Sequence, residues 1–253
     1  MSDQKSKKIF LILGISREKR NWKTPIKILQ AALPDFEIIA LDNPGMGEYH
    51  KMLVPLTIAG HVDFLKKDFE KQKGGENYLL GWSLGGMIVA DWSNRYPKDM
   101  NGTILMTSSF GPLQAPWKRI KPATVPSLVV SIFSKGRKRE EGLFEPTSNN
   151  KQNKERLVTE AMGYNNEFPV TGRNIIRQFV AASLFFTKSI KKLHPCLVLG
   201  APNDNLVSNV CSKKIQSFWK TDYQEHPTAG HDIFNDDPEW VSTKIKEWLN
   251  TIK

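Results

Sequence analysis

Ser83 lies between two glycines in the run GWSLGG, which separates two apolar stretches of the chain. This is the G-x-S-x-G pattern, in the strand-then-helix setting that it requires when its serine is a nucleophile. A sharp turn would expose the hydroxyl at a helix N-terminus, where negative charge is favoured. The N–H of Leu84 would then donate to an oxyanion. The alternative is that Ser83 only caps that helix.

Two residues far downstream could complete this chemistry. Asp204 follows the apolar run CLVLGA, and His231 lies in the loop TAGHDIF, after the next predicted strand. A serine nucleophile needs a general base, and the base needs a carboxylate that orients it. The order Ser, Asp, His along the chain is one of the known orders for such a triad. The alternative for Asp204 is a turn residue in the run PNDN.

The other four histidines are less well placed for a general base. His61 falls in a helical pattern and is expected at the surface, and His226 falls within a predicted strand. His194 precedes a proline at a strand entrance. His50 follows a loop and could line the site, but we expect a solvated side chain there.

Alternating apolar runs and helical patterns must position these residues. They predict an α/β fold with a mostly parallel, twisted sheet flanked by helices. The predicted strands cover residues 8–15, 36–42, 77–82, 102–108, 196–201 and 222–227. The predicted helices cover residues 24–33, 58–72, 84–97, 209–219 and 238–252. Catalytic groups collect at the carboxyl ends of the strands in such sheets.

Residues 111–192 interrupt this alternation and predict a helical cap, or lid, inserted between core strands. The core would then comprise residues 1–110 and 193–253, since the insertion is longer than a normal crossover. Helical patterns cover residues 125–133, 156–164 and 172–186. The polar tract 134–156 is predicted to be a mobile loop.

The net charge of +10 is concentrated in one segment. Residues 112–192 contain fifteen Lys or Arg and six Asp or Glu. A basic surface of this kind attracts acidic partners, among them nucleic acid, anionic lipid and acidic proteins. A basic cap could equally be a solvated face without a partner.

The remaining composition predicts a globular, cytoplasmic protein. No apolar run approaches the roughly 20 residues that span a bilayer, and the polar start of the chain does not resemble a secretory leader. Cys196 and Cys211 have no metal-ligand spacing and are expected to be reduced thiols. No nicotinamide, metal or phosphate motif is present, so the sequence implies no cofactor.

Four motifs together resemble the α/β-hydrolase superfamily over nearly the whole chain. They are LGWSLGG, LDNPGMG at residues 41–47, GAPNDNLV and AGHDIF, in this family's order. Within the superfamily the chain looks most like the pimeloyl-acyl-carrier-protein methyl ester esterases of biotin biosynthesis and related carboxylesterases. The resemblance implies a Ser83, Asp204 and His231 triad, with oxyanion N–H groups from Leu84 and Ile15.

Two departures from the family pattern concern the site. The loop after the first strand usually begins His-Gly, whereas here it reads Leu-Gly-Ile-Ser-Arg at residues 13–17. Without that histidine the oxyanion hole would be looser, or organised by Ser16 or Arg17. In the acid loop, Ala201 occupies a position that is usually glycine, and Gly200 precedes it.

We therefore predict a serine esterase that cleaves a carboxylic ester by acyl transfer. The basic cap suggests an acidic carrier, such as acyl-carrier protein, as the bearer of the ester. The residues predicted to bind substrate are Gly14, Trp82, Phe110, Phe133 and Phe179. Apolar cap residues could also line an acyl pocket, or could only pack the cap onto the sheet. They are Leu128, Val129, Ile132 and Phe185.

Other functions remain open at this point. A thioesterase or a lactonase would use the same triad. A different class is a basic protein without enzymatic activity that binds nucleic acid or an anionic membrane through residues 134–139. That segment lacks interleaved aromatic residues and has acidic neighbours, so nucleic acid is not expected.

Overall fold

The structure, a computed structural model, describes residues 6–111, 113–186 and 191–252. Six strands form one parallel sheet in the order β2-β1-β3-β4-β5-β6. The strands are β1 (Lys7–Ile12), β2 (Phe36–Leu41), β3 (Glu76–Trp82), β4 (Gly102–Met106), β5 (Cys196–Gly200) and β6 (Asp222–Glu225). The predicted α/β fold with its parallel sheet is confirmed. The first strand ends three residues earlier than predicted, because the chain leaves the sheet there to form a loop.

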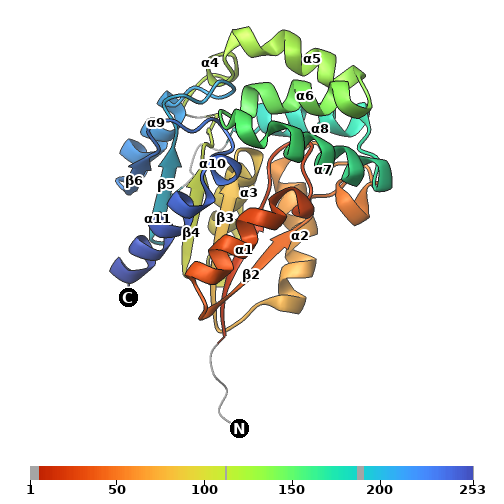
Figure 1. Ribbon diagram of the computed structural model, residues 1–253. Helices are drawn as coiled ribbons and strands as arrows, with labels where there is room; N and C mark the ends of the chain where they lie inside the picture. The colour runs from red at the N-terminus through yellow and green to blue at the C-terminus, as the bar shows by residue number, and fades with distance from the viewer. Residues whose placement is uncertain (1–5, 112, 187–190, 253) are drawn as a thin grey trace.

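Helices cover both faces of the sheet (Figure 1). On one face pack α1 (Lys23–Ala32), α10 (Ile233–Asp236) and α11 (Pro238–Thr251). On the other pack α2 (Ile58–Gln72), α3 (Leu84–Arg95) and α9 (Val210–Trp219). Short 3-10 helices occur in the connections: η1 (Lys19–Trp22), η2 (Gly47–Tyr49) and η3 (Pro97–Asp99).

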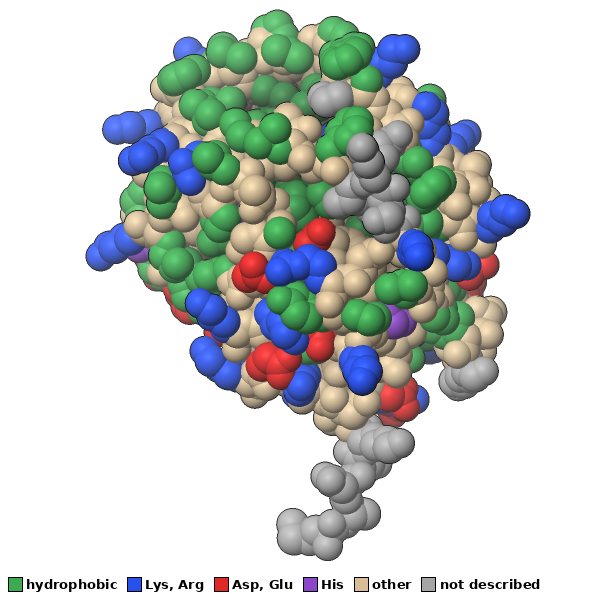
Figure 2. All heavy atoms as spheres, turned by 180° about the vertical axis from the view of Figure 1, so that it is seen from behind, with side chains coloured by type: hydrophobic (Ala, Val, Ile, Leu, Met, Phe, Trp, Pro, Cys, Tyr) green, Lys and Arg blue, Asp and Glu red, His purple; other side chains and the backbone are tan. Residues whose placement is uncertain are grey.

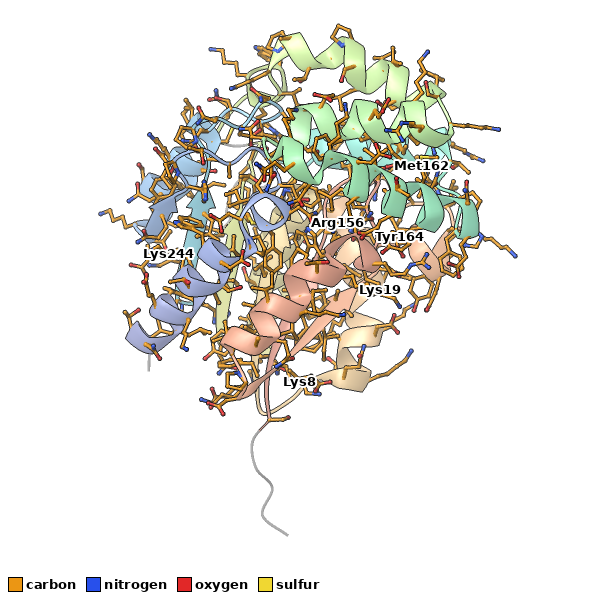
Figure 3. The ribbon with its side chains drawn as sticks, viewed as in Figure 1. Lys8, Lys19, Arg156, Met162, Tyr164 and Lys244 are labelled. Carbon is orange, nitrogen blue, oxygen red and sulfur yellow. The ribbon has the colours of Figure 1, made fainter. Side chains whose placement is uncertain are left out.

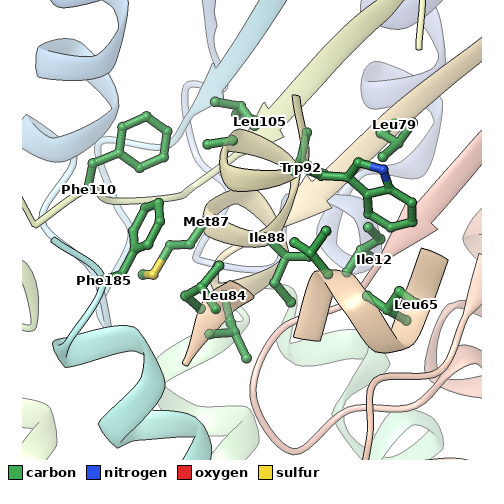
Figure 4. Close-up of a cluster of buried hydrophobic side chains, with 14 of the residues drawn as sticks. Ile12, Leu65, Leu79, Leu84, Met87, Ile88, Trp92, Leu105, Phe110 and Phe185 are labelled. Carbon is green, nitrogen blue, oxygen red and sulfur yellow. The ribbon is translucent and has the colours of Figure 1, made fainter. Parts of the chain in front are cut away.

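The central strands are apolar on both sides because both sides are covered. In β1, Ile9 and Leu11 pack in one core cluster, while Phe10 and Ile12 pack in the other. Figure 4 shows the second cluster, in which Trp92 of α3 and Ile12 pack among side chains from several elements. Each of these four β1 residues is fully buried.

The segment between β4 and β5 is helical and lies over one end of the sheet (Figure 1). It comprises α4 (Pro116–Arg119), η4 (Pro122–Thr124), α5 (Val125–Phe133), α6 (Gly136–Thr147), η5 (Lys151–Asn153), α7 (Lys154–Glu167) and α8 (Gly172–Ser183). We call it the insertion. The prediction of a mobile loop over residues 134–156 is wrong, since α6 occupies half of this tract. Leu143 and Phe144 supply the buried face of α6, and buried Arg139 donates to the carbonyl of Val170 at 2.6 Å.

Contacts with the core hold the insertion in place. Arg20 of η1 stacks on the ring of Tyr164 in α7 at 4.7 Å and pairs with Glu167 at 2.5 Å. Figure 3 shows Lys19 of η1 beside Tyr164 of α7. A further hydrogen bond joins the N–H of Asp232 to the carbonyl of Thr147 at 2.7 Å.

The burial of some charged and apolar side chains of the insertion differs from the prediction. Arg119 and Arg139 are buried, so they do not contribute to the basic surface that the sequence predicts. Conversely, large apolar side chains are exposed, among them Trp117 and Phe133. Figure 2 shows hydrophobic side chains gathered over the upper part of the molecule, with Lys and Arg around them.

Two histidine predictions are also wrong. His61 is fully buried in α2, because it falls on the face of that helix that packs on the sheet, and burial lowers its pKa to about 4. His226 lies just beyond β6, where its Nδ1 accepts from the N–H of Ala229 at 2.8 Å. It therefore shapes the loop that leads to His231.

Both cysteines are buried, unpaired thiols, and burial raises the pKa of each to about 11. In the described part of the chain, no helix combines the length and the apolar character that crossing a membrane requires. The expectation that the chain has no secretory leader rests on its polar N-terminal run. Most of that run lies outside the described residues.

Candidate active site

The sheet order brings two loops together at its carboxyl end. After β1 the chain adds β2 on one side and β3 on the other, so the strand order reverses between β1 and β3, and such a switch point opens a crevice beyond the strands. The loop after β1 contains Gly14 and Ile15, and Ser83 follows β3 directly. Gly14 lies close to the turn at Ser83, because a Cβ there would approach the Cβ of Ser83 to 3.3 Å.

Ser83 has a strained backbone, with φ 56° and ψ −113°. Strain of this kind in a non-glycine residue is typical of functional sites. Its side chain does not cap α3, contrary to the alternative stated above, and the helix begins at Leu84. Gly81 and Gly85 permit the turn, since a Cβ on either would overlap backbone atoms of Gly85 or Ile12.

His231 and Asp204 form a buried pair. His231 Nδ1 lies 2.7 Å from Asp204 Oδ2, and both side chains are almost completely buried. Asp204 Oδ1 accepts from the N–H groups of Leu206 and Val207, at 2.8 Å each, which fixes the carboxylate. With its Nδ1 proton directed at Asp204, the imidazole keeps a lone pair on Nε2. No described residue hydrogen-bonds to that Nε2.

The backbone of His231 is anchored by two side chains that the sequence analysis did not identify for this role. Its carbonyl accepts from Trp82 Nε1 at 2.9 Å and from Thr107 Oγ1 at 2.7 Å. Thr107 directly follows β4 and has a positive φ of 44°. The sequence shows only that a threonine follows the predicted strand. It does not reveal the positive φ of Thr107, which would have marked this position as unusual.

A cavity of about 90 Å³ connects these residues. Of the predicted site residues it is lined by Gly14, Ile15, Trp82, Ser83, Leu84, Phe179 and His231. Apolar side chains of the insertion form much of its remaining wall, namely Leu128, Ile132, Leu143 and Ile175. The site thus lies between the core and the insertion.

Several predicted substrate-binding residues do not line this cavity. Phe110 is buried in the core, where it packs on Phe185 and Trp219. Phe133 is 76% exposed at the end of α5, and Val129 also faces solvent. The sequence predicts an apolar helix over residues 125–133, but it does not show which of the apolar residues of α5 face the cavity.

The loop that lacks the family's histidine is held by side chains from elsewhere. The N–H of Ser16, at a φ of 62°, donates to Gln178 Oε1 of α8 at 2.9 Å. Asn43 Nδ2 donates to the carbonyl of Leu13 at 3.0 Å, and Arg17 pairs with buried Glu140 of α6 at 2.7 Å. Two of these three contacts, those of Gln178 and Glu140, come from the insertion. Side chains of the insertion therefore help to hold this loop in the absence of the histidine.

Asp232, next to His231, is a buried carboxyl. It accepts from Asn235 Nδ2 at 2.8 Å and from Trp22 Nε1 at 3.2 Å. Burial raises the pKa of Asp232 to about 6, against the opposing effect of the Asn235 hydrogen bond. The folded protein therefore binds this proton more tightly than the unfolded chain does.

Asp232→Asn is expected to stabilise the protein at neutral pH more than at acidic pH. The stability from the raised pKa is complete below about pH 4 and lost as the pH rises through 6. A shift of about two pKa units corresponds to about 3 kcal/mol, and an asparagine stays neutral throughout. Urea unfolding of wild type and variant at pH 5 and pH 7.5 checks this. An equal difference in unfolding free energy at the two pH values would contradict it.

No group of three potential metal ligands, His, Cys, Asp or Glu, occurs among the described residues.

Comparison with known proteins places the chain in a family. Residues 9–244 match the family model described as the alpha/beta hydrolase family. The chain belongs to the α/β hydrolase family. This α/β hydrolase is also 29% identical, over 117 residues, to the biotin biosynthesis bifunctional protein BioHC of Teredinibacter turnerae. That alignment covers 42% of this chain and only 19% of the bifunctional protein.

Solved structures of other α/β hydrolases share the whole fold. An esterase from Rhodococcus sp. ECU1013 superposes with a TM-score of 0.74 at 19% identity, covering 98% of this chain and 92% of the esterase. The enol-lactonase from Burkholderia xenovorans LB400 also gives a TM-score of 0.74, at 16% identity, covering 97% and 92%. These likenesses establish the fold of this hydrolase.

Proposed function

We propose that this α/β hydrolase is a serine esterase that cleaves carboxylic esters. The observation that carries the proposal is the shared cavity. Strained Ser83 and His231, whose Nε2 has no hydrogen-bond partner among the described residues, both line it, and Asp204 orients His231 through its Nδ1. A nucleophile, a base and an oriented carboxylate are the minimum that acyl transfer through a serine requires.

In the proposed mechanism, His231 Nε2 takes the proton of Ser83 while the hydroxyl oxygen attacks the acyl carbon. Asp204 keeps the imidazole oriented and stabilises its positive charge. The N–H groups of Leu84 and Ile15 hold the oxyanion, since the N–H of Leu84, the first residue of α3, has no carbonyl partner within that helix. The imidazolium then protonates the leaving alcohol, and water activated by His231 releases the acid.

The scissile bond and the leaving group are also proposals. The name of one structural neighbour, an esterase, favours an ester. The enol-lactonase has the same fold, so a lactone or a thioester stays an alternative. We also propose that residues 111–192 form a cap on a core of residues 1–110 and 193–253. A cytoplasmic location is a further proposal.

A carrier-linked ester is the finer substrate hypothesis. The basic charge of the insertion supports it, as does the likeness to BioHC. Against it, many of these cations are already paired within the insertion, such as Arg137 with Glu155 and Lys154 with Glu145. Carrier recognition would make hydrolysis of an acyl-carrier-protein ester faster than that of the free ester, and sensitive to salt. Equal efficiencies at low and high salt would remove this hypothesis.

Labelling with a fluorophosphonate tests the proposed function directly. We expect one equivalent of label per chain, attached to the peptide that contains Ser83, and loss of labelling after heat denaturation. A series of p-nitrophenyl esters of increasing acyl length should then be hydrolysed with an optimum set by the cavity. A protein that is neither labelled nor active on any ester of the series would not be a serine esterase.

A further inference from the structure

A buried arginine without an acidic partner lines the same cavity. Arg119, the last residue of α4, is 5% exposed. Its Nη2 donates to the carbonyl of Ala182 in α8 at 2.8 Å and lies 3.9 Å from Met87 Sδ. Its Nη1 is buried and has no hydrogen-bond partner among the described residues.

The rest of the cavity wall does not neutralise this charge. No Asp or Glu is among the described residues that line the cavity. The second arginine of the wall, Arg17, is already paired with Glu140. Asp204 is occupied by two backbone N–H groups and His231. Arg119 therefore stands as a cation without an acidic partner in a wall that is mostly apolar and contains no carboxylate among the described residues.

An arrangement of this kind is unfavourable unless a ligand completes it. Removing a charge from water is costly when no partner compensates it. Burial lowers the pKa of Arg119, although a guanidinium remains charged near neutral pH. The planar guanidinium matches a carboxylate in a bidentate geometry that a lysine cannot reproduce.

We propose that Arg119 binds a free carboxylate on the acyl part of the substrate, so that the enzyme prefers monoesters of dicarboxylic acids. This inference rests on the proposed esterase function and names its substrate class. The ester carbonyl would lie at Ser83, and the apolar wall would hold the methylene chain. The far carboxylate would satisfy the free donors of Arg119.

The kinetic test compares charged and neutral substrates of equal length. Monomethyl esters of dicarboxylic acids with four to eight carbons are measured against methyl esters of the matching monocarboxylic acids. Wild type should prefer the charged ester at one chain length. At that length, Arg119→Met should lower the ratio of kcat/KM for the charged ester to kcat/KM for the neutral ester about 30-fold, as loss of a charge-assisted hydrogen bond implies. Lys118→Met is the control, since it removes an exposed positive charge from the same helix.

Two further measurements separate this inference from folding defects and from the esterase function. Arg119→Lys, with its charge retained, should recover only part of the ratio, and thermal melts report the stability of each variant. Calorimetric titration of Ser83→Ala with monomethyl adipate measures binding without turnover. Adding Arg119→Met should weaken this binding at least about tenfold and leave the weaker binding of dimethyl adipate unchanged.

The outcomes are separable. A wild-type preference for neutral esters, or a ratio that Arg119→Met does not change, would overturn the carboxylate site even if Ser83 is labelled. If no ester is hydrolysed, the esterase proposal fails, and the titration alone decides the role of Arg119. Monomethyl adipate that does not bind, or binds equally without Arg119, would overturn the inference in that case too.

Discussion

Ser83→Ala is expected to reduce kcat/KM for p-nitrophenyl butyrate by about 10⁴-fold or more. The hydroxyl oxygen is the proposed nucleophile, since Ser83 combines a strained φ with a place in the cavity that His231 also lines. Steady-state hydrolysis and fluorophosphonate labelling measure the loss. Because alanine tolerates the turn about as well as serine does, the melting temperature should change little.

A matched control is available on the same helix. Ser93 is buried in α3 and donates to the carbonyl of Ala90 at 2.9 Å, away from the cavity. Ser93→Ala should lower stability by about 1 kcal/mol, as loss of one hydrogen bond does, and leave the esterase rate unchanged. More than a few per cent of wild-type turnover in Ser83→Ala would show that Ser83 is not the nucleophile.

Asp204→Asn is expected to lower kcat by about 10³- to 10⁴-fold while the fold is retained. The asparagine oxygen can still accept from the N–H groups of Leu206 and Val207, so the loop should persist. Its amide, however, would donate to His231 Nδ1, which moves the ring proton to Nε2. The imidazole could then no longer take the proton of Ser83.

Asp232→Asn is the control for charge, because it removes a carboxylate from the neighbouring residue without touching the imidazole of His231. We expect its esterase rate to fall far less than that of Asp204→Asn. Rates measured from pH 6 to pH 9 complete the test, since a repositioned base should leave a low rate that no pH restores. Comparable losses in the two variants would mean that Asp204 acts only as a nearby charge.

The sequence determined the fold class and the order of the strands and helices of the core. Buried parallel strands are continuous apolar runs, and amphipathic helices have their own period, so local patterns predict both. It also placed Ser83, Asp204 and His231 just beyond strands, where parallel topology brings side chains together. That prediction needs only chain order, because the strands of such a sheet all end at the same edge.

Only the tertiary structure decided how the insertion meets this site. The pattern of α5 did not show that Phe133 is exposed while Leu128 lines the cavity, because that depends on how the helix is rotated in the fold. The hydrogen bond from Ser16 to Gln178 joins residues 162 positions apart. The burial of Arg119 without an acidic partner likewise depends on the packing of α4 against α3 and α8. Local periodicity cannot encode such contacts, since each forms only when distant segments have folded against one another.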